Sequence, residues 1–297
     1  MNVRASIVLL LAACGSRTAL DVPDASTVKD ASPIPPPFDA GVPSIDGSVA
    51  DVNDEGCPDS GGVFGLLVAT DNVLLRFDPV TGFHPLGVLS CNNPVDLSPE
   101  SMGVARDGTA YVYFAGGGKT ASTIYRVNPE TLECSPTKYV GGDGERVGMG
   151  FTTDEQGPAE TLYVLTLTKQ LSSLDTTTFD TSAIANEDFN GELAGGGDGR
   201  LFSVVFSHTD DPGTRVVELD KKTGDVIASD SLYDLQVGQN LAFFRLGTAF
   251  YIFTQGGTSG TTTTVSSYDL PTKTLKLRLF TWPGEIVGAG SSTCASW

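Results

Sequence analysis

One short phrase recurs five times in this chain at nearly constant spacing, and it constrains the fold more than any other feature. It consists of an apolar run, an Asp or Asn, a turn rich in Pro, Thr or Gly, and a second run. The acidic or amide residue falls at Asp78, Asn128, Asp175, Asp220 and Asp269, which are 50, 47, 45 and 49 residues apart. Repeats of this length are typical of propellers and solenoids, in which each repeat is one supersecondary unit.

Each later repeat contains two further strand-like segments. A segment of small residues precedes a run of β-branched and aromatic residues, as in SMGVARDG (101–108) followed by TAYVYFA. The other small-residue segments are RVGMGFTTD (146–154), GELAGGGDG (191–199) and QNLAFFRLG (239–247). Four strands in about 47 residues is typical of a β-propeller blade. We expect the small-residue strand to lie innermost, where Gly and Ala let backbones approach closely.

The two ends of the repeat region predict the number of blades. Three strand-like segments precede Cys91, and one, within 285–297, follows the last full repeat. Together they make one more four-stranded unit, shared between the chain ends in the velcro closure of propellers. We therefore predict an all-β, five-bladed β-propeller over 63–297. The alternative is a β-sandwich with accidental spacing.

The N-terminal segment predicts export and lipidation. A basic start, Met1–Arg4, precedes an apolar run from Ala5 to Ala13 that is nine residues long. This run is shorter than the roughly 20 residues of a membrane-spanning helix and fits a signal peptide. Leu11-Ala12-Ala13-Cys14 resembles the bacterial lipobox, in which the Cys is acylated. We predict a lipoprotein signal over 1–13 with lipidation at Cys14. The alternative is an ordinary signal peptide with a chance Cys.

Between this signal and the repeats, 14–62 is dominated by Ala, Ser, Asp and Pro. No apolar face recurs there, and repeated Asp keeps the chain solvated. We expect a disordered linker that spaces the propeller from the membrane.

Several stretches of the repeat region resemble secreted, propeller-like lipoproteins of the myxobacterial type. The matching stretches are SMGVARDGTAYVYF (101–114), VGMGFTTDEQGPAETLYV (147–164), GELAGGGDGRLF (191–202) and VGAGSSTCAS (287–296), with Cys91 and Cys134. The resemblance covers most of 63–297 and implies the fold and export. It brings no catalytic residues.

The charge balance restricts the partners. The chain has 36 Asp+Glu against 18 Lys+Arg, a formal net charge of −18. A nucleic-acid partner is therefore excluded, because a basic patch is its expected footprint. We expect a monomer that contacts the membrane through its N-terminal lipid. Its location would be extracytoplasmic, anchored to the outer membrane on the periplasmic side or at the cell surface, where disulfides are permitted.

The cysteines predict two disulfides. Once Cys14 is assigned to the lipid, Cys57, Cys91, Cys134 and Cys294 remain, with three ways to pair. Cys57 precedes the first strand of the velcro blade and Cys294 follows its last strand, so this pair would staple the closure. Cys91–Cys134 then follows by elimination. Free buried thiols are the alternative.

Several motif-like segments carry little chemistry. GGGKT (116–120) lacks the first Gly of a phosphate loop, and DVNDEG (51–56) lacks the Glu that closes a calcium loop. We expect His84 on the surface and His208 in a loop beside Asp210 and Asp211, where nothing fixes a metal geometry.

Polar residues recur where each inner strand begins, and in a propeller these positions gather around the axis. They are Glu100, Glu145, Glu192, Asn240 and Glu285. Several carboxylates so placed would raise one another's pKa and form an acidic mouth for a small polar ligand or a divalent cation such as Ca²⁺. The alternative is a solvated rim that Arg146 partly neutralises.

The sequence favours a binding or scaffold module at the cell envelope, which uses the loop face around the channel to bind a protein or a glycan. The alternative is a lactonase-like or glycan-acting propeller hydrolase with a cation at the channel mouth. Such an enzyme needs a general base and usually a metal, and no predicted inner strand contains His. The sequence therefore gives no catalytic residue.

Overall fold

The computed structural model describes residues 57, 65–92, 97–116, 120–142, 145–154, 158–205, 213–238, 240–255 and 262–295. In these ranges the chain forms five antiparallel sheets of four strands each. The predicted signal (1–13), the lipidation site Cys14 and the linker (14–62), except Cys57, lie outside the described residues.

Each sheet is one blade. Blade 1 is β20-β1-β2-β3, and blades 2 to 5 are β4–β7, β8–β11, β12–β15 and β16–β19. The innermost strands are β20 (Ile286–Gly290), β4 (Leu97–Val104), β8 (Val147–Thr153), β12 (Gly191–Gly195) and β16 (Leu241–Leu246). The second strands are β1 (Gly65–Ala69), β5 (Ala110–Gly116), β9 (Glu160–Thr166), β13 (Leu201–Val205) and β17 (Ala249–Gln255). The third strands are β2 (Val73–Asp78), β6 (Thr123–Val127), β10 (Gln170–Leu174), β14 (Arg215–Leu219) and β18 (Thr263–Asp269). The outer strands are β3 (Gly82–Val88), β7 (Cys134–Pro136), β11 (Thr181–Asn186), β15 (Val226–Ser231) and β19 (Thr274–Trp282).

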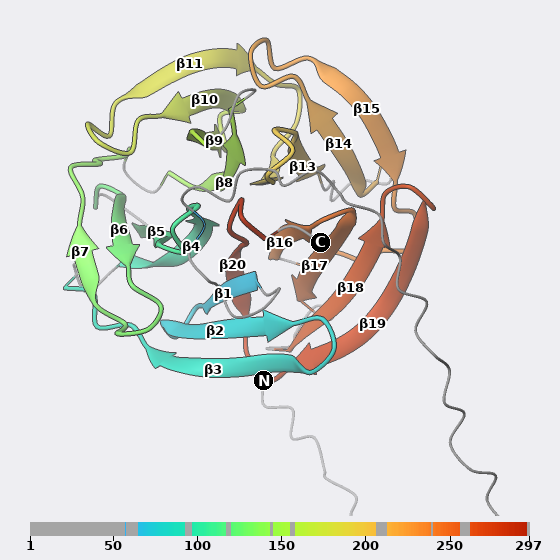
Figure 1. Ribbon diagram of the computed structural model, residues 1–297, viewed down its shortest axis with the longest axis horizontal. Coiled ribbons are helices and arrows are strands. Elements are labelled where there is room, and N and C mark those ends of the chain that lie inside the picture. Colours follow the sequence, from blue (N-terminus) through green and yellow to red (C-terminus); the bar gives the residue numbers. More distant parts are fainter. Residues whose placement is uncertain are drawn as a thin grey trace, which may run out of the picture. The chain divides into compact units, whose positions relative to one another are not determined.

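The five blades form a closed ring around a central axis (Figure 1). Each innermost strand contacts the innermost strands of both neighbouring blades, in the order β20, β4, β8, β12, β16 and back to β20. The ring is closed by β20, which pairs antiparallel with β1 so that Leu67 lies opposite Ala289 and Val68 opposite Gly288. The five-bladed propeller and its velcro closure, both predicted from the repeat, are confirmed.

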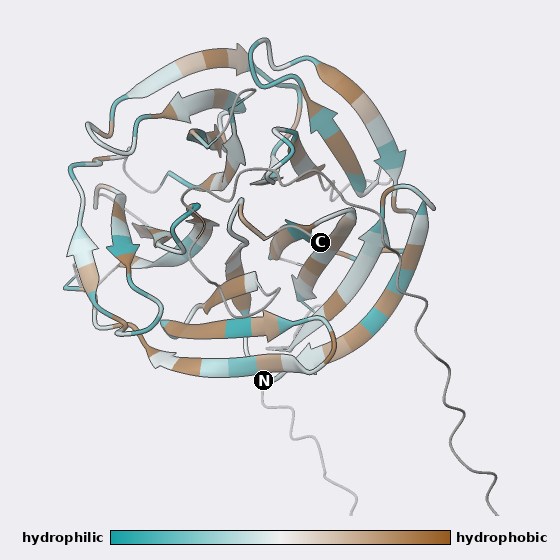
Figure 2. Ribbon diagram, viewed as in Figure 1, coloured by the Kyte–Doolittle hydropathy of each residue, from teal (hydrophilic) through white to brown (hydrophobic). Residues whose placement is uncertain are grey.

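The hydrophobic core lies between blades. Five clusters of buried side chains each join two adjacent blades, for example Met102 and Val112 of blade 2 with Leu66 and Val68 of blade 1. Figure 2 shows the hydrophobic segments along the strands of every blade. Because a blade alone leaves both faces exposed, the neighbouring blades supply the burial that stabilises each one.

The innermost strands approach one another closely, as expected for small residues. A Cβ on Gly148 would lie 2.3 Å from the carbonyl oxygen of Gly191, so this contact requires glycine. Strand β16 departs from that expectation, because Phe243 and Phe244 are both fully buried in it. These two rings enter different interblade clusters. Space for Phe244 comes from Gly65, where a Cβ would lie 2.1 Å from its ring.

The recurring Asp or Asn shapes the hairpin between the third and outer strands. In blade 3, Asp175 Oδ1 accepts hydrogen bonds from the backbone N–H groups of Thr177 (2.7 Å) and Thr178 (2.9 Å). Asn128 Oδ1 does the same in blade 2, and the carboxylates of Asp78, Asp220 and Asp269 accept from equivalent turns. This local bonding explains why the phrase recurs once per blade.

Candidate functional site

Polar residues gather at the end of the channel where the innermost strands begin. Arg146, Asn190, Asn240 and Glu285 immediately precede an innermost strand. Glu192 is the second residue of β12, and Glu100 is the fourth residue of β4, which begins earlier than the sequence predicted. We call this end the mouth, defined by Glu100, Arg146, Asn190, Glu192, Asn240 and Glu285. The five strands run parallel along the axis, so their first residues meet at one face and their last residues at the other.

A small cavity opens at the mouth. Its volume is about 90 Å³, and residues of blades 2, 3, 4 and 5 line it together with Val287 of blade 1. The polar lining comes from Glu100, Arg146, Thr166, Asn190, Glu192 and Asn240. The rest of the wall is aliphatic and consists of Val147, Leu165, Leu167, Leu241 and Val287, with the backbone of Gly148 and Gly191. The cavity therefore combines acidic groups with an apolar wall.

Glu192 is the most perturbed acid of the mouth. Its Oε2 accepts a hydrogen bond at 2.9 Å from the hydroxyl of Ser101 on β4, so this bond joins blades 2 and 4, which are not adjacent in the ring. Burial raises the pKa of Glu192 well above its ordinary value, the Ser101 bond lowers it in part, and the charge of Glu100 raises it further. A carboxyl in this state takes up a proton readily and is costly to keep ionised without a cation beside it.

Glu100 has a positively charged neighbour. Arg146 Nε lies 3.5 Å from Glu100 Oε2, and the two side chains are 57% and 18% exposed. Burial raises the pKa of Glu100, Arg146 opposes this shift, and the charge of Glu285 adds to it. Arg146 thus neutralises part of the mouth, as the sequence suggested.

The structure brings together some of the predicted mouth residues and separates others. Glu100, Glu192 and Asn240 line the cavity, whereas Glu145 and Glu285 are not among its lining residues. The Asn240 amide donates a hydrogen bond to Glu285 Oε1. The carboxylate of Glu145 instead accepts the backbone N–H of Gly142 at 2.9 Å.

Sequence reasoning missed Asn190. Its Oδ1 is buried and has no hydrogen-bond partner, and the residue lines the cavity. Asn190 immediately precedes β12, as Asn240 precedes β16 and Glu285 precedes β20. The rule that selected the other residues would have found Asn190 if the start of this strand had been placed one residue earlier.

The C-terminal segment closes the opposite end of the channel. The hydroxyls of Ser291 and Ser292 donate to the carbonyls of Arg245 (2.6 Å) and Arg106 (3.0 Å). Thr293 is 3% exposed, and its hydroxyl donates to Glu160 Oε2 at 2.8 Å. We call residues 291–295 the cap.

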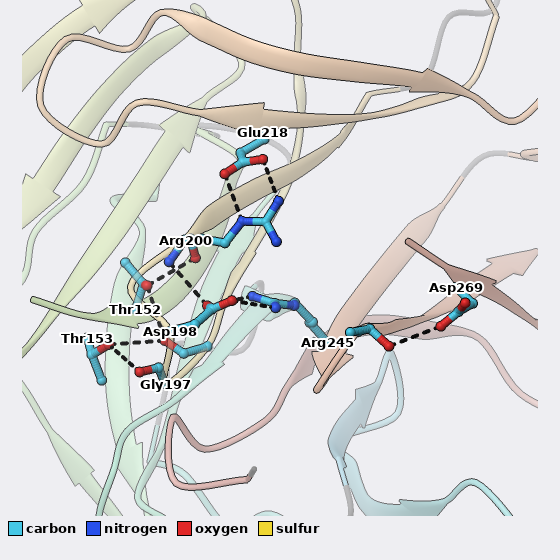
Figure 3. A network of polar contacts seen from close by, with 10 residues as sticks. Thr152, Thr153, Gly197, Asp198, Arg200, Glu218, Arg245 and Asp269 are labelled. Carbon is cyan, nitrogen blue, oxygen red and sulfur yellow. Dashed lines mark hydrogen bonds and ion pairs between the residues drawn. The ribbon is translucent and has the colours of Figure 1, made fainter. Parts of the chain in front are cut away.

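An ion-pair network supports this closed end (Figure 3). The two terminal guanidinium nitrogens of Arg245, Nη1 and Nη2, donate to Asp198 Oδ1 and Oδ2 at 2.7 and 2.6 Å. Arg200 pairs with Glu218 in the same two-bond manner, at 2.8 and 2.6 Å. Arg245 lies over the Phe202 ring, with its guanidinium carbon 5.0 Å from the ring centroid.

The structure contains both expected disulfides. Cys57 is bonded to Cys294, which joins the start of the propeller to the cap. Cys91, just after β3, is bonded to Cys134 at the start of β7, so this bond links blades 1 and 2 at the rim. The bond forms although Cys91 follows one outer strand and Cys134 begins the other.

The remaining motif candidates lie either away from the mouth or outside the described residues. Among the described residues, no group of three or more His, Cys, Asp and Glu is arranged to hold a metal ion. His84 Nε2 lies 2.7 Å from the Thr81 hydroxyl on the outer hairpin of blade 1. The calcium-loop-like segment 51–56, His208, Asp210, Asp211 and residues 117–119 of GGGKT lie outside the described residues.

No helix in the described part of the chain is long and apolar enough to cross a membrane.

The comparisons with known proteins find only distant likeness. No family model and no curated protein matches the chain. A protein of unknown function from Bacteroides caccae is 13% identical, with a TM-score of 0.44, and the match covers 76% of this chain and 84% of that one. An auxiliary nutrient binding protein from Bacteroides thetaiotaomicron is 13% identical, with a TM-score of 0.44 and coverages of 74% and 55%. The calcium-binding protein regucalcin from Agrobacterium tumefaciens is 14% identical, with a TM-score of 0.44 and coverages of 78% and 75%. At this distance they carry no argument about function, and the description of the fold depends on the strand pairing of the chain itself.

Proposed function

We propose that this protein is a binding module of the cell envelope, held to the outer membrane by lipid on Cys14, and that it binds its ligand at the mouth. The ligand would be a small polar or cationic molecule, or such a group on a protein or glycan partner. The observation that carries the proposal is the cavity of about 90 Å³, in which acidic side chains from separate blades meet, whereas the pocket between the innermost strands further along the channel measures about 10 Å³ and has no acidic lining residue.

Two features support export. The lipobox-like Leu11–Cys14 follows an apolar run of signal-peptide length. The four remaining cysteines are all paired, which suits an oxidising compartment outside the cytoplasm. Lipid on Cys14 would anchor the chain stably only if more than one acyl chain is attached.

The geometry supports binding better than hydrolysis. Sites for drug-sized ligands occupy roughly 300–1,000 Å³, far more than this cavity of about 90 Å³. The cavity is therefore too small to enclose a drug-sized substrate, although a small group or the end of a longer molecule can enter it. In addition, the described residues that line the cavity include no His to act as a base beside the two glutamates.

The test compares wild-type protein with the double variant Glu100→Gln, Glu192→Gln. Full-length lipidated protein is incubated with outer-membrane extract and washed, and the retained molecules are released and identified by mass spectrometry. We expect the wild type to retain a molecule that the double variant loses. Retention of the same molecules by both proteins would show that the ligand binds elsewhere than at the mouth.

A Cys14→Ala variant tests the anchor separately. We expect wild-type protein in the membrane fraction of fractionated cells and the variant in the soluble fraction. Equal distribution of the two proteins would contradict lipidation at this position.

A further inference from the structure

The geometry points to a specific ligand chemistry for the mouth, an inference that rests on the proposed function. We infer that the mouth binds a primary alkylammonium group. The ammonium would lie between Glu192 and Asn190, and the first methylenes of its stem would lie against the aliphatic wall.

Hydrogen-bond capacity favours an ammonium donor. A primary ammonium carries three N–H donors and no acceptor. Glu192 uses one oxygen to accept the Ser101 hydroxyl, which leaves its second oxygen for a ligand. Asn190 Oδ1 is buried without any partner and lines the same cavity. An ammonium nitrogen would satisfy both acceptors at once, and satisfying a buried orphan acceptor is favourable.

The apolar wall distinguishes an alkylammonium from a bare metal ion. Five aliphatic side chains line the cavity beside the acids, and they are Val147, Leu165, Leu167, Leu241 and Val287. Ca²⁺ requires 6–8 oxygen ligands and gains nothing from such a surface. A methylene stem, in contrast, gains from burial against it.

The cavity size limits how much of the ligand enters. About 90 Å³ accepts an ammonium with a short stem and leaves the remainder of a longer molecule outside. A quaternary ammonium has no N–H donor for Glu192 or Asn190. A quaternary ammonium should therefore bind more weakly than a primary ammonium of the same charge.

The charge of the mouth agrees with a monovalent cation. Arg146 already faces Glu100, so an added cation has Glu192 as its main partner. Burial and Glu100 raise the pKa of Glu192, and the free acid therefore holds its proton more readily. An ammonium binds best to the ionised form, so binding releases this proton, and we expect affinity to fall as pH is lowered.

Calorimetric titration of the full-length protein with n-butylammonium chloride tests the inference. We expect measurable binding at pH 8 and weaker binding at pH 5. Glu192→Gln should weaken it about 10-fold or more, since a hydrogen bond to a charged group is lost. Asn190→Ala should also weaken it, by a smaller factor. The matched control is Glu130→Gln, which removes one charge from an exposed hairpin far from the cavity.

The ligand panel separates the outcomes. Binding of 1-butanol or tetramethylammonium as tight as that of butylammonium would overturn the inference, as would unchanged binding to Glu192→Gln. Binding of blocked lysine but not butylammonium would support the chemistry and identify a peptide side chain as its source. Heat from Ca²⁺ that depends on Glu192, with none from amines, would overturn the inference and leave the proposed binding mouth standing. Envelope molecules retained equally by the wild type and the double variant would overturn both.

Discussion

The two ends of the channel are built from the same five strands, yet they differ in how many hydrogen bonds their partly buried glutamate accepts. At the closed end, Glu160 accepts the Arg106 N–H (2.6 Å) and the Thr293 hydroxyl (2.8 Å), one at each oxygen. At the mouth, Glu192 accepts one hydroxyl, and Asn190 Oδ1 accepts nothing.

The difference also appears in the titration of the two acids. Burial raises the pKa of Glu160, but the bonds from Arg106 and Thr293 oppose the shift. The pKa of Glu192 rises further, because only the Ser101 bond opposes burial. Each end also keeps a buried polar atom without a hydrogen-bond partner, Asn190 Oδ1 at the mouth and Arg245 Nε at the closed end, so the contrast lies in the two acids. The mouth holds the carboxyl whose burial is less well compensated, and such acids are often retained for function.

The largest expected effect at the closed end comes from removing its disulfide. Cys57→Ser with Cys294→Ser should lower the free energy of unfolding by about 2–5 kcal/mol, because the bond closes a loop between residues 237 positions apart. Urea denaturation without reductant measures this loss.

The rim disulfide is the control for loop length. Cys91 and Cys134 are 43 positions apart, so Cys91→Ser with Cys134→Ser should cost about 1.5 kcal/mol less by the chain-entropy argument. A larger loss of stability for the rim pair would contradict the expected dependence on loop length.

The second prediction compares ion pairs at the two ends. Asp198→Ala leaves the guanidinium of Arg245, which is 7% exposed, without its carboxylate. We expect a loss of about 3 kcal/mol, at the low end for an orphaned buried charge because Asp198 itself is 41% exposed. Glu100→Gln at the mouth should change stability by about 0.5 kcal/mol or less, because Arg146 is 57% exposed.

Arg245→Met separates the buried charge from the loss of the contact. It leaves a partly exposed carboxylate rather than a buried cation, so its cost should be smaller than that of Asp198→Ala. Thermal or urea unfolding of the three variants gives the order. If Glu100→Gln cost as much as Asp198→Ala, the contrast between the two ends would be lost.

The third prediction concerns a substitution, Glu192→Gln, that should raise stability rather than lower it. Because the pKa of Glu192 is raised in the folded protein, the native state binds more protons than the unfolded state between the two pKa values. Stability from this group is present below the unfolded pKa and is lost as pH rises through the folded pKa. Glu192→Gln removes the penalty, so we expect a higher melting temperature than wild type at pH 8 and no gain at pH 4.

Glu130→Gln serves as the control, since its side chain is exposed on a hairpin. It should leave the melting temperature unchanged at both pH values. A melting temperature of Glu192→Gln below that of wild type at pH 8 would contradict a strained acid at the mouth. If Glu192→Gln both melts at a higher temperature at pH 8 and binds the ligand more weakly, the wild-type protein gives up stability at this position in favour of function.

The fold was predictable because its signals are local and repeated. The turn of each hairpin forms through bonds between residues two or three positions apart, such as Asp175 with Thr177 and Thr178. The same phrase therefore marks every blade. The velcro strand was predictable because the chain ends supplied complementary parts of one more blade.

The site was only partly predictable, because its geometry depends on contacts between distant residues. The rule of polar strand starts selected Glu100, Glu192 and Asn240, which do line the cavity. It could not show that the Glu145 carboxylate would bond to the Gly142 N–H in its own loop. Nor could it show the aliphatic wall, because in the sequence Leu165 and Leu241 look like ordinary core residues of their strands. Only the arrangement of the blades shows that they line the cavity.

The smallest effect concerns the hairpins beyond the third strands, and its pH dependence has the opposite sign to that of Glu192. Backbone N–H bonds from Thr178 and Thr177 lower the pKa of Asp175. Its stabilisation is present above the unfolded pKa and is lost as pH falls through the folded pKa. Asp175→Asn keeps the acceptor, as Asn128 does in blade 2, where its Oδ1 accepts from Glu130 (2.8 Å) and Thr131 (3.1 Å). We expect a slightly lower melting temperature than wild type at pH 7, with the difference vanishing near pH 2. Asp175→Ala, which removes the acceptor, should stay below Asp175→Asn at every pH. If the two variants melted together, the recurring residue would act through its charge rather than through the turn it caps.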